Sequence, residues 1–88
     1  MDKKWFVYLL LCGDQTLYCG ITDDVERRLE AHRSGKGAKY TRGRGPLELV
    51  YVEQCDGHSH ALKRECAIKR FSRQEKLKMI EMFKPAAE

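Results

Sequence analysis

The sequence predicts one domain of the α/β (α+β) class, with a small three-stranded antiparallel or mixed sheet flanked by helices in the order β-β-α-β-α-α. With 88 residues, the chain can bury one modest hydrophobic core. Three stretches have strand composition, and three others have helical spacing of apolar residues, two of them opened by a capping box. We therefore expect residues 1–88 to form a single domain with its core between about positions 5 and 83.

The first predicted strand covers residues 5–12 (WFVYLLLC), which are apolar on both alternating faces. A strand with this pattern is covered on both sides, so we expect it at the centre of the sheet. Turn residues follow at 13–15, and residues 16–21 (TLYCGI) return as a second strand to form a hairpin. Gly20, near the end of that strand, indicates that another group approaches the backbone closely there.

The hairpin carries two tyrosines, Tyr8 and Tyr18, and the length of its loop decides whether they share a face. A three-residue loop pairs Leu10 with Tyr18 and puts both tyrosines on one face, whereas a two- or four-residue loop separates them. The sequence alone leaves both registers open, and most half-buried tyrosines are simply packing residues.

A short helix is predicted over residues 22–34 (TDDVERRLEAHRS), where Asp23 and Glu26 have capping-box spacing. Its inward stripe at spacings i, i+3, i+4 and i+7 consists of Val25, Arg28, Leu29 and His32. An arginine and a histidine on a buried stripe need partners, and a phosphate would serve both. The alternative is a rotated stripe with Ala31 inside and Arg28 reaching outward, which is the commoner arrangement for such a segment.

Positive charge is concentrated between positions 27 and 44, where seven Lys and Arg residues stand against one acidic residue, Glu30. A one-sided basic surface predicts a polyanionic partner, most often nucleic acid. The loop at residues 35–46 (GKGAKYTRGRGP) has no apolar periodicity, so we expect a mobile loop that adapts to a phosphate backbone. A flexible, charged connector is the alternative. The candidate nucleic-acid-binding residues are Lys36, Lys39, Tyr40, Thr41, Arg42 and Arg44.

A third strand is predicted at residues 47–54 (LELVYVEQ) and a second helix at 59–71 (SHALKRECAIKRF). The apolar stripe of this helix is Ala61, Leu62 and Ile68. Glu65 falls in the middle of the stripe, where a carboxylate is costly unless it is paired, protonated or bound to a metal. A salt bridge to Arg28 would be the ordinary explanation, and both residues would then lie on helices that cover one face of the sheet.

A third helix should begin at a second capping box, Ser72-x-x-Glu75, and run to about Phe83, with Pro85 ending it. Leu77, Ile80 and Phe83 have the spacing of its packing stripe.

The composition also excludes some classes of protein. There is no apolar run long enough to span a bilayer, and residues 6–12 are too short for a signal sequence. Four scattered cysteines without a signal peptide indicate reduced thiols, so we expect a cytoplasmic protein that does not bind membranes.

Two competing catalytic interpretations are disfavoured. The set Cys55, His58, His60 and Cys66 matches no tetrahedral zinc spacing, so we expect Cys66 in the core and the histidines exposed. Cys19 with His32 could form a nucleophile and base, but nothing nearby supplies an orienting acid or an oxyanion hole.

A third combination, Tyr8, Tyr18, Arg28, His32 and Glu65, contains the groups that phosphodiester hydrolysis needs. Here the chain resembles the GIY-YIG nuclease domains, over roughly residues 5–80. Phe6-Val7-Tyr8 and Tyr18-Cys19-Gly20 match the two signatures loosely, each keeping its tyrosine. Arg28 stands eight residues after the signature glycine, and GKGAKYTRGRGPLELVY is similar to the small stand-alone branch of that family.

The resemblance implies metal-dependent hydrolysis of DNA, with RNA not excluded as a substrate. We expect the protein to be a monomer. Glu65 would hold one Mg²⁺ or Mn²⁺, and Arg28 would stabilise the pentacovalent phosphate. Tyr18 would be the leading candidate for general base, assisted by Tyr8, with His32 as an alternative base or relay. Repair and recombination are the pathways that the family suggests.

Two features depart from the family pattern. Many members carry an asparagine after the glutamate helix, but this sequence contains no asparagine. Larger members have a separate DNA-targeting domain, for which 88 residues leave no room, so we expect DNA affinity that is weak, structure-selective at best, or supplied by a protein partner. A non-catalytic nucleic-acid-binding module that retains the nuclease fold is therefore the alternative function.

Overall fold

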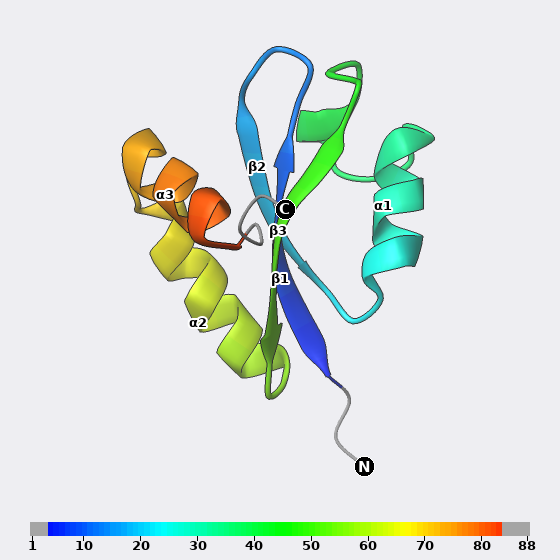
Figure 1. Ribbon diagram of the computed structural model, residues 1–88. Coiled ribbons are helices and arrows are strands. Elements are labelled where there is room, and N and C mark those ends of the chain that lie inside the picture. Colours follow the sequence, from blue (N-terminus) through cyan, green and yellow to red (C-terminus); the bar gives the residue numbers. More distant parts are fainter. Residues whose placement is uncertain (1–3, 84–88) are drawn as a thin grey trace, which may run out of the picture.

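The computed structural model describes residues 4–83 and confirms the predicted order of elements (Figure 1). The elements are β1 (Trp5–Leu11), β2 (Leu17–Thr22), α1 (Val25–Arg33), β3 (Glu48–Cys55), α2 (His58–Lys69) and α3 (Arg73–Phe83). A 3₁₀ turn, η1 (Lys39–Thr41), lies in the loop that was expected to be irregular. The prediction for Pro85 falls outside the described residues. No helix within residues 4–83 is long and apolar enough to cross a bilayer.

The three strands form one antiparallel sheet in the order β2-β1-β3. β1 is central, as its two apolar faces predict. The hairpin pairs Leu10 with Tyr18 and Tyr8 with Gly20, which is the register of the three-residue loop. Tyr8 and Tyr18 therefore share a face, and their ring centroids lie 6.3 Å apart.

The helices cover opposite faces of this sheet, with α1 on one side and α2 and α3 on the other (Figure 1). Side chains alternate along β1, so Tyr8 points toward α1 whereas Val7 and Leu9 point into the core beneath α2 and α3. The expectation that Arg28 and Glu65 lie over one face is therefore wrong, because Arg28 belongs to α1 and Glu65 to α2.

The main core lies between the sheet and α2 and α3. Its buried members are Val7, Leu9, Cys19, Val50, Cys55, Ala61, Ile68 and Ile80. Four other predictions for these helices are wrong, since Leu62 is 44% exposed, Leu77 is 42% exposed, Phe83 is 47% exposed and Cys66 lies at the surface. A three-stranded sheet covers only a narrow strip of each helix, so the buried stripe is narrower than the apolar periodicity suggests.

Side-chain caps fix the starts of two helices. The N-cap of α1 is Asp24 and not the predicted Asp23, because the Asp24 carboxylate accepts a hydrogen bond from the Arg27 backbone N–H at 3.1 Å. The predicted capping box of α3 is confirmed. The Ser72 N–H donates to the Glu75 carboxylate at 2.8 Å, and the Glu75 N–H donates to the Ser72 hydroxyl at 3.2 Å.

Candidate active site

Four of the five candidate catalytic residues lie together on the α1 face of the sheet. The Tyr8 hydroxyl of the central strand is 2.7 Å from Nε2 of His32, and both residues are only 2% exposed. His32 comes from the last turn of α1, which confirms it as the inward residue of that helix. Tyr18 is half-buried on the edge strand β2, with its ring centroid 5.3 Å from that of His32.

The second ring nitrogen of His32 contacts Thr41. Its Nδ1 lies 2.8 Å from the Thr41 hydroxyl, which in turn donates to the Ala38 carbonyl at 3.0 Å. Thr41 is 2% exposed. The structure thus places Thr41 inside the molecule, and its predicted contact with phosphate at the surface is replaced by the contact with His32.

Arg28 lies half-buried on α1 beside both tyrosines. Burial raises the pKa of Tyr8 to about 12, and hydrogen bonding to Arg28 opposes that rise without cancelling it. The same hydrogen bond raises the pKa of Arg28 above its ordinary value. At neutral pH Tyr8 therefore keeps its proton and Arg28 keeps its charge, which suits Arg28 to binding an anion that reaches the tyrosines.

His32 is held in the opposite state. Burial lowers its pKa below the ordinary value, and the nearby charge of Arg28 lowers it further. The imidazole is therefore neutral at pH 7 and has one nitrogen that can accept a proton.

Two glycines allow these side chains to pack closely. A Cβ at Gly20 would lie 2.6 Å from the Tyr8 hydroxyl, so the approach predicted at Gly20 is that of Tyr8. A Cβ at Gly37 would lie 2.5 Å from Nδ1 of His32. Sequence reasoning missed Gly37, because one glycine in a glycine-rich loop carries no signal that separates it from its neighbours.

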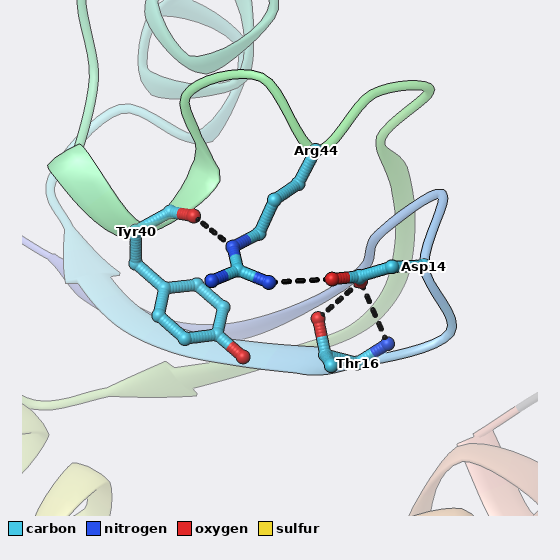
Figure 2. Close-up of polar contacts among 4 residues, drawn as sticks. All are labelled: Asp14, Thr16, Tyr40 and Arg44. Carbon is cyan, nitrogen blue, oxygen red and sulfur yellow. Dashed lines mark hydrogen bonds and ion pairs between the residues drawn. The ribbon is translucent and has the colours of Figure 1, made fainter.

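The basic loop is tied to the hairpin turn through Arg44 (Figure 2). The Arg44 guanidinium donates to the Asp14 carboxylate at 2.5 Å and to the Tyr40 carbonyl at 2.6 Å. It also lies 4.3 Å from the centroid of the Tyr40 ring. Asp14 is itself oriented by Thr16, whose hydroxyl donates to it at 2.6 Å.

Further contacts hold this loop in place. The Gly13 N–H donates to the Arg44 carbonyl at 2.6 Å, and the Tyr40 ring stacks on Tyr18 with centroids 5.7 Å apart. These contacts anchor the segment around Tyr40 and Arg44 to the hairpin, which the prediction of a mobile loop did not include. Local composition could not reveal this, since the anchoring residues Gly13 and Asp14 lie about 30 positions earlier in the chain.

The remaining candidates for nucleic-acid contact differ in exposure. Lys36, Lys39 and Arg42 are exposed, and Tyr40 is 41% exposed. The guanidinium of Arg44 is already engaged by Asp14.

Glu65 lies apart from this cluster. Its side chain is 18% exposed and pairs with Lys69 at 3.4 Å, one turn along α2, so its ion-pair partner is not Arg28. Glu65 is close enough to β2 that its charge adds to the burial that raises the pKa of Cys19 to about 11. Cys19 and Tyr18 are adjacent in β2 and face opposite sides, so Glu65 and Tyr18 flank the same stretch of this edge strand.

Few side chains among the described residues could bind a metal ion together. Within residues 4–83 no three His, Cys, Asp or Glu side chains are arranged to hold a metal ion. A single carboxylate such as Glu65 still fits Mg²⁺, which is often held by one or two carboxylates while water and substrate phosphates complete its shell. The raised pKa of Cys19 disfavours a nucleophilic thiolate there.

The family model described as the GIY-YIG catalytic domain matches residues 4–78. This chain belongs to the GIY-YIG family. Membership implies a catalytic domain of the endonuclease type, and the matched range includes Tyr8, Tyr18 and Gly20, on which the resemblance in the sequence rests.

Several small members of the family are similar along nearly the whole chain. The UPF0213 protein OB0043 of Oceanobacillus iheyensis is 53% identical over 81 residues, which cover 92% of this chain and 94% of that protein. A UPF0213 protein of Syntrophus aciditrophicus is 53% identical over 79 residues, which cover 89% of this chain and 91% of that protein. These relatives form the small single-domain branch that the sequence predicted.

Two solution structures show the same fold. The UPF0213 protein BH0048 of Bacillus halodurans is 43% identical with a TM-score of 0.58, and the match covers 90% of this chain and 84% of that one. The protein EF2693 of E. faecalis is 37% identical with a TM-score of 0.62, and the match covers 99% of this chain and 96% of that one.

Proposed function

We propose that this chain is an endonuclease that hydrolyses DNA phosphodiester bonds with the help of Mg²⁺ or Mn²⁺. One observation carries the proposal, namely that the Tyr8 hydroxyl lies 2.7 Å from Nε2 of His32, with Arg28 beside it on α1. Attack of water on a phosphodiester needs a proton acceptor and a fixed positive charge at one place, and this cluster supplies both.

The substrate phosphate is proposed to lie across the open edge of β2. Arg28 would bind the phosphate oxygens from the α1 side, and Glu65 would hold the metal ion from the α2 side. When bound, the metal would stabilise negative charge on the phosphate oxygens. The edge of a small sheet can be reached from both sides, so residues over opposite faces can act on one phosphate.

Proton transfer would run through the two tyrosines and His32. Tyr18 is half-buried and would orient the attacking water. Tyr8 would take a proton from that water as it passes its own proton to Nε2 of His32, 2.7 Å away. His32 would then be the final acceptor, since its lowered pKa leaves Nε2 unprotonated at pH 7. As the new P–O bond forms, the P–O bond to one sugar oxygen would break, and that oxygen would leave with the electron pair and take a proton from solvent.

The first test is cleavage of labelled duplex, nicked, flap and single-stranded DNA with Mg²⁺ or Mn²⁺, and with a chelator added. We expect cleavage that the chelator stops. The Glu65→Gln variant should cleave DNA about 10- to 100-fold more slowly than the wild type at limiting Mg²⁺, because losing the carboxylate weakens metal binding. Its rate should recover partly at high Mg²⁺.

The matched control is Glu81→Gln, which removes an exposed carboxylate from α3 and should cleave like the wild type. Equal cleavage by the wild type and Glu65→Gln at every metal concentration would contradict the role of Glu65. Binding without cleavage by the wild type would favour the alternative, a nucleic-acid-binding module with this fold.

The exposed basic residues should control the salt dependence of DNA binding. We expect Lys39→Ala and Arg42→Ala each to lower the slope of log affinity against log salt by up to about one unit, because each loses one phosphate contact. Titrations at several salt concentrations measure this slope. Lys78→Ala, which removes an exposed charge from α3, serves as the control. An unchanged slope in both loop variants would mean that the loop does not touch the backbone.

Branched, nicked or single-stranded DNA from repair or recombination is the substrate class that we propose, with targeting supplied by a protein partner. The substrate panel decides between these DNA forms, and a parallel set of RNA oligonucleotides tests the choice of DNA over RNA.

A further inference from the structure

The hydrogen bonds around Thr41 determine which nitrogen of His32 carries the proton. A threonine hydroxyl has one proton to donate, and at Thr41 it goes to the Ala38 carbonyl at 3.0 Å. The Thr41 oxygen can then only accept a hydrogen bond from Nδ1 of His32, 2.8 Å away. Nδ1 of His32 must therefore bear the hydrogen of the neutral ring.

We infer that Thr41 is a positioning residue that fixes His32 as the Nδ1–H tautomer, so that Nε2 is the acceptor for the Tyr8 proton. A neutral imidazole has one N–H, so a proton on Nδ1 leaves a lone pair on Nε2. Nε2 faces the Tyr8 hydroxyl at 2.7 Å, which is the geometry that the relay needs. This inference rests on the proposed function for its consequence in catalysis, but the tautomer can be observed on its own.

The surroundings hold the ring in this orientation. His32 and Thr41 are both 2% exposed, so water has little access to replace either contact. Gly37 packs against the ring so closely that a Cβ there would meet Nδ1 at 2.5 Å. Thr41 belongs to the turn η1, and the loop that carries it is fastened to the hairpin turn by the contact of Arg44 with Asp14.

The test is ¹⁵N NMR of the histidine rings in the full-length protein, above the pH at which the rings titrate. We expect wild-type His32 to show a protonated Nδ1 and an unprotonated Nε2. Thr41→Val keeps the shape of the side chain but removes the hydroxyl oxygen that accepts from Nδ1 of His32. The His32 ring should therefore shift toward the Nε2–H tautomer. Thr41→Ser retains the hydroxyl and should restore the wild-type pattern. His58 and His60 are exposed on α2, and their signals serve as internal references.

Cleavage rates supply the second readout. Thr41→Val should be slower by at least about tenfold, and Thr41→Ser should stay within about threefold of the wild type, because only the valine removes the acceptor. An Nε2–H tautomer in the wild type would overturn the inference, as would an unchanged tautomer in Thr41→Val. If the wild type fails to cleave nucleic acid, the proposed function falls, and the spectra still decide whether Thr41 sets the tautomer.

Discussion

Replacing Arg28 with alanine is expected to lower the rate of DNA cleavage by about 10²- to 10³-fold, because a preorganised charge at the reacting phosphate is lost. Arg28 is half-buried beside Tyr8 and Tyr18, so an anion that reaches the tyrosines would meet its charge. Single-turnover cleavage at saturating enzyme measures the chemical step, and circular dichroism checks that the fold is kept.

Two further variants distinguish a direct contact between Arg28 and the phosphate from a general effect of positive charge. Arg27→Ala removes the same charge from the neighbouring, exposed position of α1 and should change the rate by less than about threefold. Arg28→Lys keeps the charge but loses the planar fork, so it should fall between the wild type and Arg28→Ala. Equal losses in Arg27→Ala and Arg28→Ala would show that the effect is long-range electrostatics.

The local pattern of the chain predicts the strands and helices well, because that pattern has a local physical cause. Residues 5–12 are apolar on both faces, and the resulting strand is central. The capping box at Ser72 and Glu75 starts α3 where it was expected. Each signal is complete within a few residues, so no distant part of the chain is needed to interpret it.

The arrangement of the site depends on distant contacts that the pattern does not encode. Periodicity indicates which side of a helix is apolar, but it does not tell which face of the sheet that helix covers. Arg28 and Glu65 were for this reason expected together, although they belong to opposite faces. The choice of face depends on where the chain crosses between elements, which is decided by the packing of the whole domain.

In the basic loop, the sequence likewise does not reveal which role each charged side chain has. Arg42 and Arg44 are two positions apart in one glycine-rich segment and look equivalent in the sequence. In the structure Arg42 is exposed, whereas Arg44 binds Asp14 and so helps to hold the loop. Counting charges predicts a basic surface but cannot separate the charges that bind a partner from those that stabilise the fold.

The Gly20→Ala substitution is the second large effect that we expect. An added Cβ would lie 2.6 Å from the Tyr8 hydroxyl, 2.8 Å from its ring carbon Cζ and 3.0 Å from the Tyr18 ring. Tyr8 is 2% exposed and has little room to move, so we expect the free energy of unfolding to fall by about 1–3 kcal/mol. The displaced hydroxyl would leave Nε2 of His32, and cleavage should slow by about 10²-fold, as expected for a misplaced catalytic group.

A double-mutant cycle with Tyr8→Phe isolates the cause of this effect. The atom nearest to the new Cβ is the Tyr8 oxygen, so alanine at position 20 should destabilise Tyr8→Phe less than it destabilises the wild type. Removing the hydroxyl should recover only part of the lost stability, since Cζ of residue 8 would still lie 2.8 Å from the added Cβ.

Gly57→Ala is the control, because a Cβ at Gly57 has open space and the loss of stability there should stay under about 1 kcal/mol. Urea titrations of the four proteins in the cycle give the coupling energy. Simple additivity of the two changes would mean that Gly20 is needed for some reason other than its contact with the Tyr8 hydroxyl.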